Sequence, residues 1–307
     1  MTLLKLVCQG CGQPIWGNCL SALGATWHPE HFCCAGCNRP LGDTHFHLHN
    51  GAPFHSECYS RLIAPHCAYC GKALMGEYLI DHWGTQHCPE HRQHYPSCAF
   101  CGRLVPDQLA RSAREISCSV CQSSAVETTT EARPHFSHVK HWVSNQGLSY
   151  NNLPLSLELC DQSRLAELLN NRGQTHPRGA TTSSTYIQDG RVMHAKVNGI
   201  AVLQGLPAVL FQGVTTHELG HVWLIVHGIQ ALPNWAEEGF CEYLSHRYYD
   251  DLNTPEGRYH AVCIEDNADP VYGEGFRRVR PLADALGFSR FLEILRTTKK
   301  LPLTRNN

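Results

Sequence analysis

Apolar residues are most continuous between residues 207 and 227, in the segment PAVLFQGVTTHELGHVWLIVH. Apolar side chains fall on every side of a helix here, as they do in helices buried at the centre of a domain. Pro207 suits the first turn of such a helix, and Gly228 suits its C-terminal end. The pattern therefore predicts a buried central helix between these two residues.

A second helix is predicted in DQSRLAELLNNRG, residues 161–173. Its apolar residues at positions 165, 168 and 169 fall on one side of the helix, so the segment is amphipathic. Either Asp161 or Ser163 could cap its first turn, and Gly173 could end it.

Three further segments lie between the first 121 residues and the central helix. Residues 122–148 begin polar and are expected to contain a helix. Residues 175–184, THPRGATTSS, predict a loop. Residues 185–205 predict β structure with a turn at Asp189-Gly190.

Cysteine is distributed unevenly along the 307 residues. Fourteen of the 17 Cys fall within the first 121 residues, mostly as C-x2-C pairs with interspersed His. The N-terminal sequence has no apolar segment long enough for a signal peptide, and no run approaches the ~18 residues of a membrane span. We therefore expect a cytoplasmic protein that does not bind membranes, and zinc ligands in place of disulfides.

The pairs combine into four groups of four predicted ligands. A gap of two residues presents both side chains of a pair to one tetrahedral ion, and a hairpin of about 16 residues returns the second pair. Zinc then replaces the large core that so small a module cannot build. The groups are Cys8, Cys11, His28 and His31; Cys34, Cys37, His55 and Cys58; Cys67, Cys70, Cys88 and His91; Cys98, Cys101, Cys118 and Cys121.

Two double-zinc units in tandem resemble LIM domains, with WHPEHFCCAGCNRPL at the junction within the first. We place the LIM unit at residues 1–64 and a LIM-like unit, which lacks the Trp-His junction, at 65–126. His31 stands where that family usually has Cys, and His87 is an alternative to Cys88. LIM units mostly bind proteins. The eight Lys/Arg and eight Asp/Glu of residues 1–121 show no basic surplus, so we expect no nucleic-acid binding.

The central helix carries the candidate chemistry, in the sequence HELGH. Because the chain has 21 His, the five-residue pattern alone is moderate evidence. His217 and His221 are four residues apart on one helical face, so both imidazoles can reach one ion. Glu218 lies beside them, where it could take a proton from a metal-activated water.

A catalytic zinc needs a third protein ligand and an open fourth position. The segment WAEEGFCEY, from Trp235, resembles the W-x-x-E-G-F-x-x-Y segment of gluzincin peptidases, and HELGHVW resembles their helix. The resemblance implies that Glu238 is the third ligand, at the start of another helix, with Glu237 as the competitor. Tyr272, His246 and Tyr248 are candidate donors to the oxyanion, and His246 could instead support a ligand from behind.

Several segments together resemble the DA-one family of LIM-domain zinc peptidases. They are HCPEH, CSVCQSSAVETT, GLP at 205–207, HELGHVW, EEGFC, Ser245-His246 and YGEGFR at 272–277. The resemblance implies an endopeptidase that cleaves proteins, over residues 127–307. The chain starts at its LIM unit and has no ubiquitin-interacting helices before it, so ubiquitin control is doubtful. The short chain suggests a bacterial relative of this family.

These patterns predict an α+β protein with tandem zinc-ribbon-like LIM and LIM-like modules, followed by a zincin-like metallopeptidase domain. It would bind four structural Zn²⁺ ions and one catalytic Zn²⁺ ion, and the LIM modules would recognise a protein substrate or partner, or inhibit the enzyme. Two alternatives are a non-enzymatic LIM scaffold with a degenerate peptidase domain and an aminopeptidase. The latter is disfavoured because no G-x-M-E-N-like segment precedes the helix.

Overall fold

A computed structural model describes residues 6–42, 45–106, 115–150, 153–169, 177–188 and 191–302, with the backbone alone for 185–188 and 191–195. The chain divides into two compact units, Met1–Pro96 and Ser97–Asn307. The boundary differs from the predicted modules: the fourth Cys group, assigned from sequence to a LIM-like unit ending at residue 126, belongs to the C-terminal unit. No helix in the described ranges is long and apolar enough to cross a bilayer.

The N-terminal unit consists of short hairpins and short helices. Strands β1–β2, β3–β4 and β5–β6 form antiparallel pairs. The elements are β1 (Leu20–Ala22), β2 (Ala25–Trp27), the 3-10 helix η1 (Pro29–His31), β3 (Phe46–His49), β4 (Ala52–His55), α1 (Ser56–Leu62), β5 (Leu79–Ile80), β6 (Gln86–His87) and α2 (His91–His94).

Metal-ligand side chains form much of the interior of this unit. In each of the first three predicted groups, the four ligand atoms lie within 4.8 Å of one another. The Cys34 thiol accepts hydrogen bonds from the backbone N–H groups of Gly36 and His55, each at 3.3 Å. Cys34 also packs in a small core with Phe32 and Phe54. Of these predicted ligands, Cys8, Cys34, Cys58 and Cys67 are buried where an ordinary domain would have a larger apolar core, whereas Cys11 and Cys70 are exposed.

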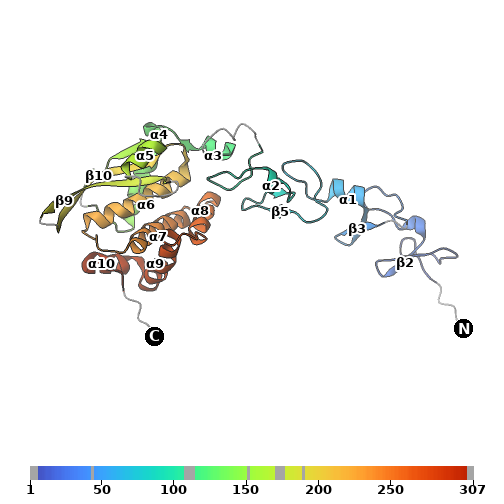
Figure 1. The fold of residues 1–307 in the computed structure, drawn as a ribbon. Helices are drawn as coiled ribbons and strands as arrows, with labels where there is room; N and C mark the ends of the chain where they lie inside the picture. The colour runs from blue at the N-terminus through green and yellow to red at the C-terminus, as the bar shows by residue number, and fades with distance from the viewer. Residues whose placement is uncertain are drawn as a thin grey trace. The chain divides into compact units, whose positions relative to one another are not determined.

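The C-terminal unit has a mixed sheet and several long helices (Figure 1). In the sheet, β10 pairs in parallel with β8 and antiparallel with β9. The elements are α3 (Ser119–Ser123), β7 (Ala125–Val126), α4 (Thr129–Asn145), β8 (Leu157–Cys160), α5 (Gln162–Leu168), β9 (Gly179–Gln188), β10 (Arg191–Leu203), β11 (Leu206–Pro207), α6 (Ala208–Val226), α7 (Asn234–Leu252), α8 (Pro255–Glu265), α9 (Tyr272–Leu286) and α10 (Phe288–Thr298).

Helix α6 is the predicted central helix. It packs against β9 and β10 on one side and against α7 on the other, and α4 also contacts it (Figure 1). Eleven of its residues are buried, including Phe211, Leu219 and Trp223. Because the helix is enclosed by other elements, it is apolar on most sides, as its sequence predicts.

The other predicted elements differ in their limits. Helix α4 lies within residues 122–148 and begins with a capping box between Thr128 and Glu131. Asp161 caps α5, accepting a hydrogen bond from the Arg164 N–H at 2.8 Å, whereas the predicted end at Gly173 and the turn at Asp189-Gly190 lie outside the described residues.

The prediction of a loop over residues 175–184 is wrong for its second half. Strand β9 begins at Gly179, because its polar residues pair with β10 and pack on α6. Helix α7 likewise begins at Asn234, one turn before Glu238. Residues near the start of β9 and Glu238 on α7 therefore belong to regular elements, whose backbone hydrogen bonds fix their positions.

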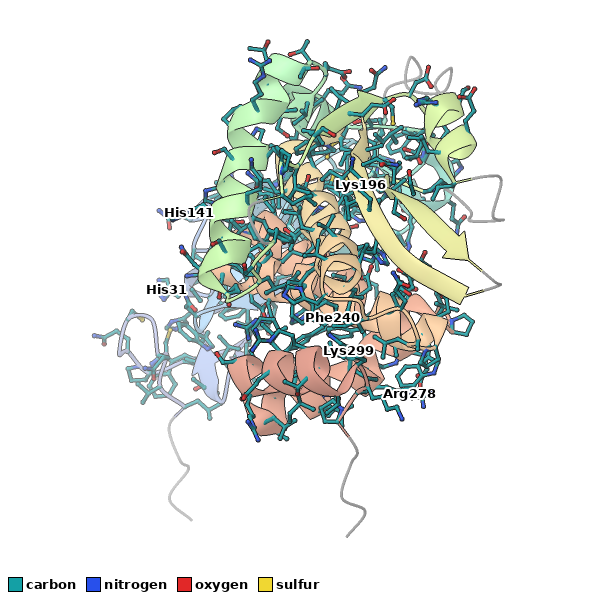
Figure 2. The ribbon with its side chains drawn as sticks, turned by 90° about the vertical axis from the view of Figure 1, so that its left-hand side faces the viewer. His31, His141, Lys196, Phe240, Arg278 and Lys299 are labelled. Atoms are coloured by element: carbon teal, nitrogen blue, oxygen red, sulfur yellow. The ribbon has the colours of Figure 1, made fainter. Side chains whose placement is uncertain are left out.

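The helices that follow α6 approach one another closely at two glycines. A Cβ atom at Gly239 of α7 would lie 2.3 Å from the Gly275 carbonyl carbon of α9. Beside this contact, Phe240, labelled in Figure 2, is fully buried against Trp223 and Phe291. The glycine pair therefore lets α9 approach the part of α7 that carries Glu238.

The fourth Cys group packs within the C-terminal unit. Its four ligand atoms lie within 4.8 Å of one another, and all four residues are buried. The Arg178 guanidinium donates to the Ala99 carbonyl at 3.2 Å and lies 5.7 Å from the Phe100 ring centroid. Arg178 directly precedes β9, so the group is joined to the strand that packs on α6.

Candidate metal centre

The two histidines of HELGH converge on one carboxylate. Helix α6 places the Nε2 atoms of His217 and His221 3.2 Å apart. From α7, Glu238 Oε2 lies 3.1 Å from His217 Nε2 and 3.4 Å from His221 Nε2. Two ligands that each lie about 2.1 Å from a tetrahedral zinc are roughly 3.4 Å apart, so this donor set has the spacing that zinc requires.

Two other carboxylates support the histidines from the opposite side of each ring. Glu242 Oε1 accepts a hydrogen bond from His217 Nδ1 at 3.1 Å, and Glu237 Oε1 accepts one from His221 Nδ1 at 3.0 Å. Such contacts fix the ring orientation and leave Nε2 to face the metal. Glu237, the sequence-level competitor of Glu238, therefore contacts the Nδ1 side of one ring, whereas Glu238 is shared by both Nε2 atoms.

The centre is buried and strongly polar. Burial alone would raise the pKa of Glu238, but hydrogen bonds from His217 and His221 hold that pKa well below its usual value. Burial alone would lower the pKa of His217, but Glu238 and Glu242 raise it well above its usual value. The Glu238 carboxylate thus stays ionised beside the two rings, as a ligand of a divalent cation requires.

Glu218 contacts β9, in the part of that strand for which the sequence predicts a loop. The Thr181 hydroxyl lies 2.7 Å from Glu218 Oε2 and 3.0 Å from the Glu218 carbonyl oxygen, and can donate to either. A Cβ at Gly179 would lie 2.6 Å from Glu218 Oε1, so β9 passes this close only with glycine there. The carboxylate therefore lies between α6 and the start of β9.

Tyr272 is the predicted oxyanion donor that the structure brings to the histidines. It is the first residue of α9, and its ring centroid lies 6.2 Å from that of His217. Burial raises the pKa of Tyr272, so its phenol stays protonated at neutral pH. The close contact of Gly239 with Gly275 brings α9 to this position.

The other two candidate donors, His246 and Tyr248, contact residues outside the histidine pair. Two turns after Glu238 on α7, His246 Nδ1 lies 3.3 Å from Asp250 and its Nε2 lies 3.0 Å from Glu265. The Tyr248 ring packs on Trp142 of α4, with centroids 5.1 Å apart. The described contacts of both side chains thus connect α7 with its neighbouring helices and do not reach the histidine pair.

Three residues at the centre were missed by the sequence analysis. Glu242 follows Glu238 by four residues on a helix, a spacing that could have indicated it. Cys241 Sγ lies within 4.8 Å of ring nitrogens of His217 and His221. Thr181 comes from β9, far away in the sequence, and no local pattern points to it.

At the N-terminal groups, the structure separates the two alternatives for one ligand. Cys88, with Cys67, Cys70 and His91, forms the third group. His87 is buried, and its Nδ1 lies 2.9 Å from the Cys88 carbonyl oxygen. The described geometry therefore favours Cys88, which also keeps the two-residue gap.

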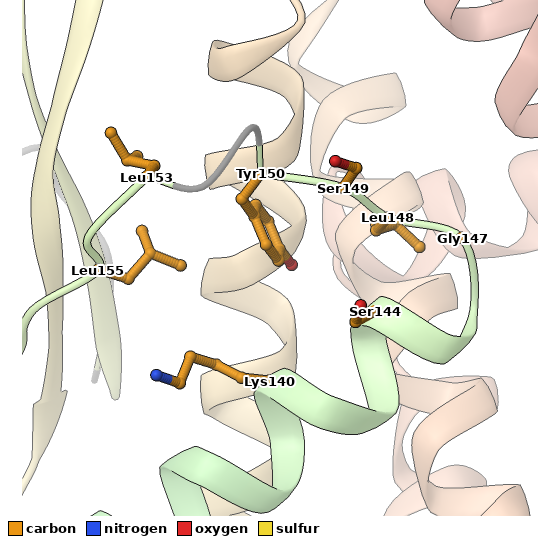
Figure 3. A pocket seen from close by; sticks show the side chains of 8 residues that line it. All are labelled: Lys140, Ser144, Gly147, Leu148, Ser149, Tyr150, Leu153 and Leu155. Atoms are coloured by element: carbon orange, nitrogen blue, oxygen red, sulfur yellow. The ribbon is translucent and has the colours of Figure 1, made fainter.

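A surface pocket lies between the end of α4 and the segment that follows it (Figure 3). Lys140, Tyr150 and Leu155 are among its lining residues, and none of the predicted ligands lines it. The Tyr150 side chain points toward α6 and donates to the Leu219 carbonyl at 3.3 Å (Figure 3). Tyr150 therefore joins the segment after α4 to the helix that carries HELGH.

Models of known families match two separate parts of the chain. A LIM-domain model matches residues 8–63. The model of the DA1-like family, described as Protein DA1, matches residues 155–261. The chain thus carries a LIM zinc-binding module and a DA1-like, largely helical domain, whose matched part includes HELGH and Glu238 and ends before Tyr272.

Several plant proteins are similar to most of this chain. Protein DA1 of Arabidopsis thaliana is 25% identical over 97% of this chain and 68% of its own length. Protein DA1-related 1 of the same plant is 25% identical over 96% of this chain and 66% of its own length. LIM domain-containing protein HDR3 of Oryza sativa subsp. japonica is 24% identical over 97% of this chain and 74% of its own length. The chain therefore spans about two thirds to three quarters of these relatives.

Proposed function

We propose that the protein is a zinc-dependent endopeptidase of the zincin type. The observation that carries the proposal is the convergence of His217 Nε2 and His221 Nε2 on Glu238 Oε2, with a separate carboxylate behind each ring. These three residues would hold the ion, and Glu242 and Glu237 would orient the rings. A zinc ion held there supplies a Lewis acid for a water molecule and for the substrate carbonyl.

The side chains around the centre supply the rest of the chemistry. Glu218 takes the proton of the attacking water and passes it to the leaving amine. Thr181 positions the Glu218 carboxylate, which it contacts at 2.7 Å. Tyr272, a protonated phenol beside His217, donates a hydrogen bond to the oxyanion, an interaction commonly worth about 3 kcal/mol.

Strand β9 supports endopeptidase activity over removal of terminal residues. Among the described strands, β9 is at the edge of its sheet, with β10 on one side. An extended peptide could pair with the other edge and pass Glu218 in either direction. Thr181, on this strand, contacts Glu218, the proposed general base, at 2.7 Å.

The proposal is tested first by counting zinc. Elemental analysis of the wild type should give about five zinc ions per chain, and of His217→Ala/His221→Ala about four. Equal counts near four would mean that HELGH holds no ion and that the protein is a zinc-built binding module. Glu218→Gln should keep the wild-type zinc content and lose cleavage of a denatured protein substrate, because it removes the base alone.

The LIM module is proposed to bind a protein. LIM domains generally mediate protein contacts, and the described part of this module exposes apolar side chains, with Trp16 78% and Leu48 50% exposed. If the module recruits substrates, its removal should raise KM for a protein and leave turnover of a short peptide unchanged. If it inhibits the enzyme, turnover of the short peptide should rise.

A further inference from the structure

Cys241 is a buried thiol for which the proposed hydrolysis has no use. It follows Glu238 by three residues on α7 and has no exposed surface. Its Sγ lies within 4.8 Å of ring nitrogens of both His217 and His221, which also lie that close to each other. The thiol is therefore next to the two residues that the proposed zinc site needs most.

The metal-binding helix is shaped to admit this sulfur. A Cβ atom at Gly220, within HELGH, would lie 2.9 Å from Cys241 Sγ and 3.3 Å from its Cα. Any larger residue would push α7 and the thiol away from α6. Glycine at this position thus brings the sulfur against the turn that joins His217 to His221.

Thiolate and imidazole are the two ligands that zinc takes most readily. A nitrogen and a sulfur bound to one tetrahedral zinc are roughly 3.6 Å apart. The group within 4.8 Å contains the two histidines and Cys241 without Glu238, so binding of one ion by all four residues requires the side chains to move closer together. Cys160 provides a contrast in the same unit: it is also buried, but its thiol donates to the Val202 carbonyl at 3.7 Å.

We propose that Cys241 is a fourth protein ligand of the ion held by His217, His221 and Glu238, an inference that rests on the function proposed above. On binding, the thiol releases its proton to solvent, and sulfur takes the position that water would otherwise hold. An ion with four protein ligands is closed. The resting enzyme is therefore latent, and it opens when the thiolate leaves the ion.

Cobalt spectroscopy on the full chain tests this inference. Co²⁺ is exchanged into the wild type and Cys241→Ala, and the spectrum of His217→Ala/His221→Ala is subtracted from each to remove the four Cys-rich groups. The wild-type difference spectrum should contain a thiolate-to-cobalt charge-transfer band, and Cys241→Ala should lack it. Zinc affinity of this site should fall at least about tenfold in Cys241→Ala, and peptide turnover should rise.

Two further variants make the result decisive. Cys160→Ala removes another buried thiol of the unit and should keep the band, whereas Cys241→Ser, which preserves size, should lose it. A band of equal strength in the wild type and both Cys241 variants would overturn the inference. Turnover that falls in these variants would overturn the closed resting form.

The experiment distinguishes failure of the Cys241 inference from failure of the proposed peptidase function. Cobalt bound at the histidine pair without a thiolate band would overturn the role of Cys241 and leave the peptidase proposal standing. If His217→Ala/His221→Ala binds as many ions as the wild type, both are overturned.

Discussion

The Thr181 hydroxyl, at the start of β9, lies 2.7 Å from the Glu218 carboxylate in the middle of α6. The two residues are 37 positions apart in the sequence. Their contact is possible because Gly179 leaves room for the Glu218 side chain beside the strand. The proposed general base is thus positioned by a strand and not by its own helix.

Thr181→Val should impair catalysis without loss of metal. Valine has nearly the shape of threonine but cannot donate a hydrogen bond, and a hydrogen bond to a charged group contributes about 1.5–3 kcal/mol. We expect kcat to fall about tenfold or more while KM and zinc content stay unchanged. Thr182→Val is the matched control, because Thr182 donates to the Gly199 carbonyl and not to Glu218. Equal effects of the two substitutions would exclude a specific role for Thr181.

The two neighbouring glutamates of α7 should differ in their effect on zinc. Glu238→Gln removes the carboxylate shared by both Nε2 atoms, so the zinc count should fall by one. Glu237→Gln replaces the carboxylate behind His221 with a neutral amide and should only weaken zinc binding, by about 10- to 100-fold. Competition with a chelator followed by elemental analysis measures both. Loss of the ion in Glu237→Gln alone would reverse the assignment of the ligand.

Gly239→Ala should destabilise the C-terminal unit and displace Tyr272. The added methyl would meet the backbone of Gly275, which cannot move as a flexible side chain could. Overpacking of this kind lowers the free energy of unfolding by about 1–3 kcal/mol. Thermal unfolding should show the loss, and Gly76→Ala, with open space around its added methyl, should not. An unchanged melting temperature in Gly239→Ala would contradict the close approach of α7 and α9.

His260 should make the fold sensitive to mild acid. Burial, with a smaller effect of Arg178, lowers the pKa of His260 from 6.5 to about 4. Between these two pH values the unfolded chain binds more protons than the folded chain, so stability falls as the pH falls from about 6.5 toward 4. The full loss from this group is on the order of 3 kcal/mol.

The matched variant for this prediction is His260→Gln, which cannot take up a proton. Its melting temperature should fall less steeply between pH 7 and about pH 5 than that of the wild type. Both proteins keep all four Cys-rich groups, so acid release of zinc from these groups affects them alike. Parallel melting curves against pH would show that His260 does not titrate as proposed.

The fourth Cys group should be more important to the enzyme than the first. Cys98 belongs to the unit that carries HELGH, and Arg178 joins the group to β9 through the Ala99 carbonyl. Cys98→Ser should therefore lower both the melting temperature of that unit and peptide turnover. Cys8→Ser removes a ligand of a group in the other unit and should not lower peptide turnover. If Cys8→Ser abolished turnover of a short peptide, the two units would be coupled.

The sequence by itself determined the features whose chemistry depends on local spacing. Pairs of ligands two residues apart predict each of the four Cys-rich groups, and the structure brings each group together. The spacing of His217 and His221 follows from the pitch of one helix, and the apolar character of α6 follows from its burial. In each case the cause lies within one element or one hairpin, so neighbouring residues carry the signal.

Tertiary structure alone decided which distant side chains complete the centre. Thr181 reaches Glu218 only because β9 pairs with β10 and packs on α6, and the polar sequence before position 185 has no strand pattern. Cys241 lies against the histidines only because two helices approach each other at Gly220. The division of the chain after Pro96 has the same origin, because a long-range contact joins the fourth Cys group to Arg178 before β9, and no local pattern encodes such a contact.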